Sequence, residues 1–294
     1  MGSLEVVRRR RRREAACVGT VLLLCAALRA QTPTPELDSS NTEASTRTIS
    51  SALKGEAQRY VADGGVILLA PLHWDSGSWT QAAIAVASVA LLSTQDQRID
   101  AAIARNRSSG TDSVSADVTP LGSYAAIGVS VGSLGAGLLF KNTELRDTGR
   151  DAIEAEVFAA GIITPILKKT VGRLRPSQGS DADEYHPLSN DQSFPSGHST
   201  EAFAVASVFA ARSRGWVVPV VAYTLASGVA FARMNDRAHF ASDVVAGAII
   251  GTAVGHTVVR LHAPDSEKSI SWNLVPVPAR RGAGMGIRLE TGGP

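Results

Sequence analysis

Apolar residues recur along most of this chain at the spacing of helical turns. From Val66 onward, apolar stretches of helical length alternate with short polar segments, and no long run shows the strict alternation of a strand. The pattern predicts about six helices, near residues 79–95, 120–140, 151–170, 198–212, 216–233 and 243–261. We therefore expect an all-α fold, a bundle of about six core helices, with a polar loop between residues 105 and 119.

The N-terminal part has a different character from the helical part. Six consecutive arginines, Arg8 to Arg13, precede a short apolar run that ends in small residues near Ala27 and Ala30. This order predicts a signal peptide over residues 1–30, with an uncleaved membrane anchor as the alternative. Residues 31–59 are polar and predict a linker, which places the start of the helical domain at residue 60.

The C-terminal tail, residues 264–294, follows the helical domain of residues 60–263. Two short runs with strand-like composition, 272–277 and 285–289, flank a turn-forming segment at Arg280-Arg281-Gly282. This arrangement predicts a small C-terminal hairpin.

The net charge limits the classes of partner that this chain can bind, and the position of the cysteines limits its disulfides. Of 29 Lys and Arg, seven lie in residues 1–30, as do two of the 27 Asp and Glu, so the remainder has 22 basic and 25 acidic groups and a net charge of −3. This balance argues against nucleic acid as a partner. Both cysteines, Cys17 and Cys25, fall inside the predicted signal peptide, so disulfides are not expected in the mature chain.

The sequence contains features for and against membrane insertion. Gly247, Gly251 and Gly255 form a stripe of small residues like those that pack spanning helices. The mean hydropathy is close to zero, however, and the predicted helix 198–212 is short and carries Glu201. We expect an exported domain, in the periplasm or on the outer face of the inner membrane, soluble or peripherally bound rather than integral.

Three polar segments interrupt the second half of the helical pattern. They are Lys168-Lys-Thr-Val-Gly-Arg-Leu-Arg175-Pro176, then Pro195-Ser196-Gly197-His198, then Arg233 through His239 to Asp243. Since they fall at the ends of successive predicted helices, an up-and-down bundle would bring them to one end. Together they offer three cations, a helix start and two histidines, which suits phosphoryl transfer without a metal.

Each residue type in these segments has a chemical reason to be there. The guanidinium groups of Arg175 and Arg233 can each hold two phosphate oxygens, and Lys168 supplies a compact positive charge. Ser196 and Gly197 lie at the predicted start of a helix, where backbone N–H groups face an anion. These five residues are the expected phosphate-binding set.

The expected catalytic set consists of His239, His198 and Asp243. Asp243 follows His239 by four residues, in the first turn of a helix for which Ser242 is the expected N-cap. A carboxylate on one ring nitrogen of His239 would leave the other nitrogen free to attack phosphorus. His198 would then protonate the leaving oxygen and later activate water.

The three segments resemble the signature that joins type 2 phosphatidic acid phosphatases, bacterial class A acid phosphatases and vanadium haloperoxidases. They match K-x6-R-P, P-S-G-H and S-R-x5-H-x3-D in order, except that Ala232 stands where the family carries Ser. The resemblance implies a phosphohistidine at His239 and a domain of this type over residues 60–263. Phosphorylated lipids, at a membrane surface, or small phosphomonoesters are the implied substrates, and no metal or other cofactor is expected.

Two alternatives remain at this stage. A vanadium-dependent haloperoxidase would use the same cradle for vanadate, which resembles the transferred phosphate in charge and geometry; the modest length of this chain favours it less. A non-catalytic exported phosphate-binding module would be expected to have lost one of the two histidines, whereas both His198 and His239 are present.

Overall fold

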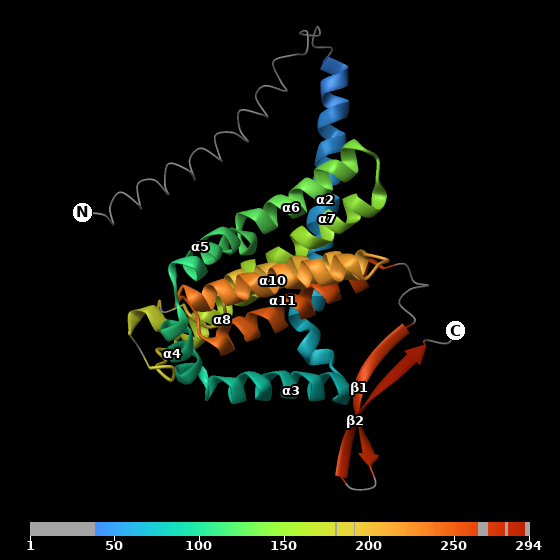
Figure 1. Ribbon diagram of the computed structural model, residues 1–294. Coiled ribbons are helices and arrows are strands. Elements are labelled where there is room, and N and C mark those ends of the chain that lie inside the picture. Colours follow the sequence, from blue (N-terminus) through green and yellow to red (C-terminus); the bar gives the residue numbers. More distant parts are fainter. Residues whose placement is uncertain (1–38, 180, 191, 264–269, 280–281, 292–294) are drawn as a thin grey trace, which may run out of the picture. The chain divides into compact units, whose positions relative to one another are not determined.

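The computed structural model describes residues 39–179, 181–190, 192–263, 270–279 and 282–291, and side chains from Lys54 to Ala263 apart from positions 180 and 191. The chain divides into two compact units, Met1–Ala57 and Gln58–Pro294. Residues 39–57 of the first unit are helical. The second unit contains the helical bundle (Figure 1). The predicted signal peptide lies outside the described residues.

The prediction of an all-α fold is confirmed, and every predicted helix has a counterpart. Five of them are single α-helices: α3 (Ser76–Ser93), α6 (Tyr124–Leu139), α9 (Gly197–Arg212), α10 (Val217–Asn235) and α11 (Ala241–His262). The sixth, predicted at 151–170, is a composite of α7 (Thr143–Glu156), the π-helical segment η3 (Val157–Ile163) and α8 (Thr164–Val171).

Three further helices were not expected from the apolar pattern. They are α2 (Ser39–Leu69), α4 (Asp96–Asn106) and α5 (Ser109–Val118), and short 3₁₀ turns occupy η1 (Ala70–His73), η2 (Thr119–Gly122) and η4 (Pro176–Gln178). The linker predicted at 31–59 is therefore wrong from Ser39 onward, and so is the loop predicted at 105–119. These helices are polar, and local features such as the capping box of Ser108 and Thr111 begin them without an apolar stripe.

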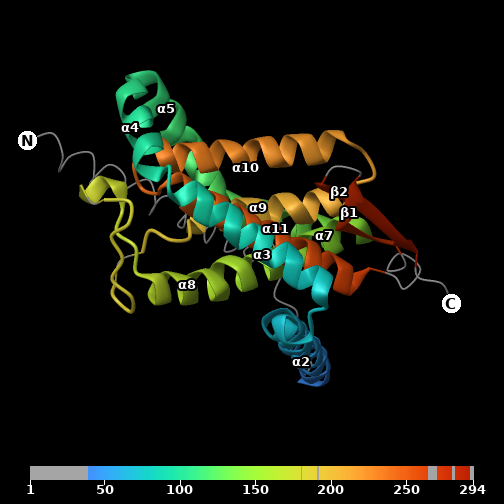
Figure 2. The same cartoon turned by 90° about the horizontal axis from the view of Figure 1, so that it is seen from below.

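Helix α9 is central to the bundle and packs against α7, α10 and α11 (Figure 2). The glycine stripe of α11 makes the closest of these contacts. A Cβ added to Gly251 would lie 2.2 Å from the carbonyl oxygen of Thr200, and one added to Gly247 would lie 2.5 Å from that of Ser196. Only glycine permits this approach, so the stripe serves helix packing.

The core consists mainly of small apolar side chains. One cluster joins α7, η3, α9 and α11, and a second joins α9 to α10; the fully buried members include Ala152, Ala155, Ala204, Val208, Val229 and Val258. Alanine and valine allow helix axes to lie close together, which fixes the ends of the helices relative to one another. The loops between these helices therefore start and end at fixed positions.

The loops that carry the three polar segments lie at one end of the bundle. In Figures 1 and 2, α4, α5 and the chain between α8 and α9 occupy the same end as the turn from α10 to α11. The N–H of Ser196 donates to the carbonyl of Asp243 across 3.0 Å, and the N–H of Ser193 donates to the carbonyl of Arg173 across 2.9 Å. Backbone hydrogen bonds thus connect the second segment to the third directly, and the first segment to the residues just before the second.

The predicted C-terminal hairpin is present. Strands β1 (Ile270–Ala279) and β2 (Gly282–Thr291) pair antiparallel, with Trp272 opposite Leu289 and Val277 opposite Gly284.

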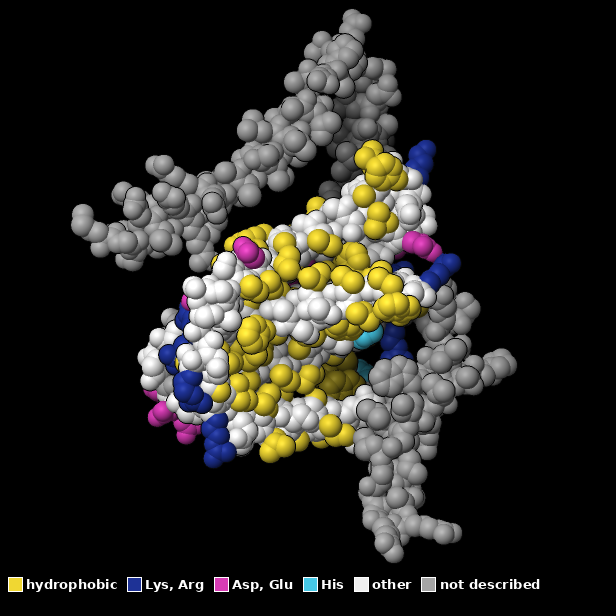
Figure 3. Space-filling view, viewed as in Figure 1, with side chains coloured by type: hydrophobic (Ala, Val, Ile, Leu, Met, Phe, Trp, Pro, Cys, Tyr) yellow, Lys and Arg dark blue, Asp and Glu magenta, His cyan; other side chains and the backbone are white. Residues whose placement is uncertain are grey.

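Two helices of the described chain, α10 and α11, are long and apolar enough to cross a membrane, and α5–η2 with α6 would form a third span bent by 43°. Large apolar side chains on α6 and α10 are exposed, among them Val129 and Val221, at 51% each. Hydrophobic side chains gather over these helices, whereas charged side chains lie mainly at the two ends of the bundle (Figure 3). Soluble proteins rarely expose contiguous apolar surface of this kind.

Candidate active site

The Pro-Ser-Gly-His segment forms the start of α9, as the sequence predicts. Ser196 is the N-cap, and its hydroxyl accepts a hydrogen bond from the N–H of Ser199 at 3.4 Å. Gly197 is the first helical residue, and an added Cβ there would lie 3.8 Å from Cε of Lys168. The helix start and the ammonium-bearing side chain therefore border the same space, where the positive end of the helix dipole favours an anion.

The three expected cations come from three different helix ends. Lys168 lies in the last turn of α8 and donates to the carbonyl of Gln192, Arg175 follows the end of that helix, and Arg233 lies in the last turn of α10. The Nη1 atom of Arg233 donates to Oδ2 of Asp236 at 2.9 Å. Burial, followed by the charges of Arg175 and Arg233, lowers the pKa of Lys168 to about 8. The cations are therefore close enough to repel one another.

Gly172 ends α8 and turns the chain back toward the site. Its φ of 59° lies in the left-handed region, and an added Cβ would lie 1.8 Å from the carbonyl oxygen of His186. Glycine is required here for both conformation and space. The turn fixes the direction in which the following arginines, Arg173 and Arg175, leave the helix.

Both expected catalytic histidines lie within this positive field. His239 is almost fully buried, and burial lowers its pKa to about 4. Burial and then the charge of Arg233 lower the pKa of His198 to about 4, with a smaller contribution from His239. Both rings are accordingly neutral near pH 7 in the ligand-free protein, as a nitrogen nucleophile must be.

The geometry around His239 differs from the expected direct pairing with Asp243. The Nδ1 atom of His239 lies 2.7 Å from the carbonyl oxygen of Ser193 but 3.8 Å from Oδ2 of Asp243. The second distance is too long for a hydrogen bond, so Asp243 acts on the ring through charge. A carbonyl can only accept, so Nδ1 carries the proton and Nε2 has a free lone pair.

Asp243 is held by donors that the motif did not reveal. Its Oδ2 accepts from the hydroxyl of Ser193 at 2.6 Å and from the N–H of Phe240 at 2.9 Å, and its Oδ1 accepts from Arg173 at 2.6 Å. Ser193 is therefore a residue that sequence reasoning missed, because one serine in an irregular loop carries no pattern.

Ser242 is not the N-cap of the last helix, contrary to expectation. Helix α11 begins at Ala241 with Phe240 as the N-cap residue, and the side chain of Asp243 accepts the Phe240 N–H instead. The hydroxyl of Ser242 is buried against Asp96 and Arg173. Oδ1 of Asp96 accepts the N–H of Ser242 at the helix start at 2.9 Å, so a residue of α4 caps α11 and the serine hydroxyl makes a tertiary contact.

Ala232, the departure from the motif, is 1% exposed on α10 next to Arg233. Lys169, the neighbour of Lys168, donates to the carbonyl of Ser189 and the side chain of Asn190, and so binds the loop before α9.

One group of described residues has the spacing of metal ligands, at the other end of the bundle. Asp63, Glu154 and His262 place ligand atoms within 4.8 Å of one another. The guanidinium of Arg59 already lies among them, paired with Glu154, and His262 also contacts Asp151 at 2.8 Å. Cations from the protein itself thus balance these carboxylates, and we interpret the group as an ion-pair network that joins α2, α7 and α11.

Comparison with known proteins finds one family model whose match includes all three segments. Residues 155–266 match the model of the PAP2 superfamily. A lipid A 1-phosphatase of Porphyromonas gingivalis is 40% identical over 90 residues, which are 30% of this chain and 18% of that protein. A decaprenylphosphoryl-5-phosphoribose phosphatase of Mycobacterium tuberculosis is 35% identical over 104 residues, 35% of this chain and 56% of that protein. The chain thus spans at most about half the length of these two relatives.

Among solved structures, a transmembrane PAP2 type phosphatidylglycerolphosphate phosphatase of Bacillus subtilis is similar. The TM-score is 0.48 and the sequence identity is 22%, and the match covers 61% of this chain and 94% of that one.

Proposed function

Because residues 155–266 match the model of the PAP2 superfamily, we propose that this protein is a member of that superfamily and a metal-independent phosphatase that hydrolyses lipid phosphates through a phosphohistidine at His239. The observation that carries the proposal is the 2.7 Å contact between Nδ1 of His239 and the carbonyl of Ser193. This contact places the proton on Nδ1, so the free lone pair of the ring is on Nε2, which is the atom required for attack on phosphorus.

The reaction has two steps. Nε2 of His239 attacks phosphorus, the bond from phosphorus to the ester oxygen breaks, and His198 gives its proton to the departing oxygen. Water then loses a proton to His198 and attacks the phosphohistidine, which releases phosphate and restores the free imidazole of His239. No metal ion is needed, because Lys168, Arg175 and Arg233 supply the positive charge that the transferred group requires.

His198 must acquire a proton before it can act as an acid. With a pKa of about 4 it is neutral near pH 7 in the free protein. A bound phosphate ester adds negative charge beside the ring and offsets the cations that lower this pKa. Substrate binding therefore raises the pKa of His198, so that the ring is protonated when it acts as the acid. The step needs no other proton donor.

A groove beside the site supports a lipid as the leaving group. It has a volume of about 440 Å³, runs between α6, α9 and α10, and has an entirely apolar lining that includes Leu121, Val129, Val205, Phe209, Val221 and Val229. A Cβ added to Gly122 would lie 2.5 Å from Val229 and 2.8 Å from the carbonyl of His198, so one end of the groove adjoins the active site. A hydrocarbon tail fits this surface and a small polar leaving group does not.

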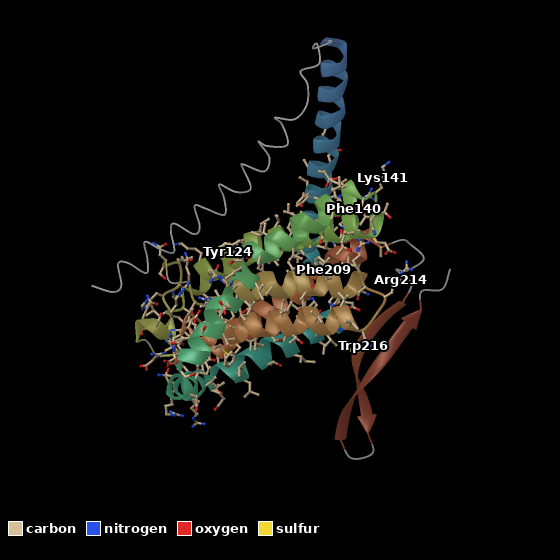
Figure 4. All side chains as sticks on the ribbon, turned by 45° about the horizontal axis from the view of Figure 1, so that its top comes forward. Tyr124, Phe140, Lys141, Phe209, Arg214 and Trp216 are labelled. Atoms are coloured by element: carbon tan, nitrogen blue, oxygen red, sulfur yellow. The ribbon has the colours of Figure 1, made fainter. Side chains whose placement is uncertain are left out.

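The other end of the groove lies far from the phosphate cradle. Phe209, labelled in Figure 4 on α9, lines that end near Trp216 at the start of α10. Phe209 lies eleven positions after His198 on α9, which corresponds to about 17 Å at about 1.5 Å per residue. A tail bound along the groove would place its phosphorylated head at the helix start of α9.

The same apolar surface supports a location in the membrane. We propose that α6, α10 and α11 lie in the lipid bilayer, with the active site at its surface on the side to which residues 1–30 direct the chain. Alkaline carbonate extraction tests the first part, since release of the protein from the membrane pellet would contradict it. A cysteine placed at the exposed Asn106 tests the second, because an impermeant maleimide should label it in intact cells.

The proposed chemistry is tested by phosphate release from lipid A, phosphatidate and p-nitrophenyl phosphate in the presence of EDTA. The wild type should hydrolyse at least one lipid, and His239→Ala should lose at least about a thousandfold in kcat. Acid-labile, base-stable radioactive phosphate on the protein would identify the phosphohistidine. Near wild-type activity of His239→Ala would overturn the mechanism, and bromide oxidation by the vanadate-loaded protein without hydrolysis would favour a haloperoxidase.

The proposed substrate class is tested by filling the groove. Ala222 lines it, so Ala222→Phe should raise KM for long-chain lipid phosphates about tenfold, while p-nitrophenyl phosphate hydrolysis stays unchanged. Ala253→Phe is the matched control, because Ala253 is exposed on α11 outside the groove. An equal effect of the two substitutions would argue against a tail in the groove.

A further inference from the structure

Arg173 is a fully buried arginine that lies between α4 and the first turn of α11. Its guanidinium group uses all five of its N–H donors. Nε donates to the carbonyl of Ala182 at 3.0 Å, Nη2 donates to the same carbonyl and to Asp96 at 2.8 Å, and Nη1 donates to Ser242 at 2.8 Å and Asp243 at 2.6 Å. Such complete use of the donors gives the side chain a single orientation.

The flat faces of this guanidinium are covered as well. The carbon Cζ of Arg173 lies 4.3 Å from the ring centre of Phe240 and 5.4 Å from that of Tyr185. The two carboxylates that pair with Arg173, those of Asp96 and Asp243, are both 0% exposed. Water therefore cannot replace a lost partner, and each charge depends on the others.

Asp96 connects this arginine to the helix start that carries Asp243. Its Oδ1 accepts the N–H of Ser242 at 2.9 Å, and its Oδ2 accepts from the Ser242 hydroxyl and from Arg173. Asp96 belongs to α4, a helix that contributes none of the motif residues. The carboxylate thus fixes both the position of Arg173 and the backbone next to Asp243.

The chain of contacts continues from Asp243 to the nucleophile. Asp243 accepts from the hydroxyl of Ser193 at 2.6 Å, and the carbonyl of the same Ser193 lies 2.7 Å from Nδ1 of His239. A carboxylate that became protonated would have to donate a hydrogen bond where it now accepts three. The carbonyl that sets the tautomer of His239 would then lose its support.

We propose that Asp96 and Arg173 are positioning residues for the reaction at His239. They keep Asp243 ionised and fixed, and through Ser193 they hold the imidazole with Nε2 available for attack. Neither is placed to contact the phosphate. This inference rests on the proposed phosphatase function, and it extends the active site to α4, outside the three sequence motifs.

The test uses kcat and KM as functions of pH for Arg173→Met, Arg173→Lys and Asp96→Asn. Without the cation, the buried carboxylate of Asp243 takes up a proton more readily, so the acid limb of kcat should move to higher pH by about one unit. We expect kcat at neutral pH to fall at least about tenfold in Arg173→Met, and KM to stay within about twofold because phosphate contacts are untouched. Arg173→Lys should restore part of the loss.

The matched control is Asp100→Asn. Asp100 lies on the same helix as Asp96 and pairs with Arg237 at 2.7 Å, so this change also breaks a partly buried ion pair without touching Asp243. Its acid limb should coincide with that of the wild type. A purely structural role for Asp96 and Arg173 predicts lower melting temperatures with an unshifted acid limb in every variant, and that result would overturn the inference.

Two further measurements keep the test decisive. If Arg173→Met does not fold, Arg173→Gln removes the same cation with a polar side chain in its place and still reports the acid limb. Arg173→Lys and Asp96→Asn keep a cation beside Asp243, so in these variants kcat should fall without a rise of the limb. The double variant Arg173→Met/Asp243→Asn should be no slower than Asp243→Asn alone, because both act through one carboxylate; additive losses would contradict the proposal. Failure of the phosphatase function itself is distinguishable, since the wild type would then show no activity that His239→Ala removes.

Discussion

The carbonyl oxygen of Ser193 lies 2.7 Å from Nδ1 of His239, whereas the nearest oxygen of Asp243 lies 3.8 Å from the same atom. The backbone therefore sets the tautomer of the ring, and the carboxylate supports that backbone and adds negative charge nearby. A backbone acceptor cannot be removed by substitution, so side-chain changes around it should weaken catalysis in steps.

Ser193→Ala tests this arrangement. The change removes one of three hydrogen bonds to Asp243 but keeps the carbonyl that faces His239. We expect a loss of about 1 kcal/mol in stability and a several-fold lower kcat. Ser207→Ala is the control, since Ser207 is equally buried but donates its hydroxyl proton to the carbonyl of Ala204 within its own helix, α9. Equal activity in both variants would contradict a role for Ser193.

Phosphate binding should be accompanied by proton uptake at His198. The pKa of about 4 in the free protein should rise when a bound anion offsets the surrounding cations. At pH 6 to 7 the site then takes up close to one proton as inorganic phosphate binds, which calorimetry in buffers of different ionisation enthalpy measures. His198→Ala should abolish the uptake, whereas His186→Ala, in the exposed loop before α9, should retain it. Uptake that persisted in His198→Ala would assign the proton to another group.

The basic limb of kcat/KM should lie near pH 8. Burial and the neighbouring arginines lower the pKa of Lys168 to about 8, so above that pH the ammonium loses its charge and the free enzyme holds the anion less well. Because kcat/KM reports the free enzyme, the limb appears there rather than in kcat. Lys168→Arg should move the limb to higher pH. Lys169→Arg, one residue away and bonded to the loop, should leave it in place.

Gly251→Ala should separate α11 from α9. The added Cβ would lie 2.2 Å from the carbonyl oxygen of Thr200 and 2.8 Å from the N of Ala204, so one helix must shift. We expect a loss of about 1–3 kcal/mol and a lower melting temperature. Gly128→Ala on α6 is the control, because an added Cβ meets no atom within 4 Å, and alanine should stabilise the helix by about 0.5–1 kcal/mol. A similar decrease in both variants would show that glycine packing is not the cause.

The candidate site residues could be picked out from the sequence because their pattern is local. Lys168 and Arg175 have the K-x6-R spacing of the motif, and Ser196 to His198 are consecutive. Each segment falls at the end of a strongly apolar helix. The spacing identified the helix starts and ends, and an up-and-down bundle then required the segments to meet. The position of Ser196 at the N-terminus of α9 agrees with this reasoning.

The supporting residues could not be predicted in this way. Asp96 and Arg173 are 77 positions apart, and each alone is indistinguishable from a solvated surface charge. Helices α4 and α5 were missed for the same reason: their polar residues face partners from distant parts of the chain rather than an apolar core. Ser242 had the sequence of a helix cap, but its burial against Asp96 gave it another contact.

The sequence by itself determined the fold class and singled out the candidate phosphate-binding and histidine residues, because helix periodicity and motif spacing act over a few residues. Only the tertiary structure decided which acceptor holds Nδ1 of His239, which cation neutralises Asp243, and where the apolar groove between α6, α9 and α10 lies. These depend on helix packing that brings distant charges into a space without water, where a single buried partner fixes both the charge and the orientation of its neighbour.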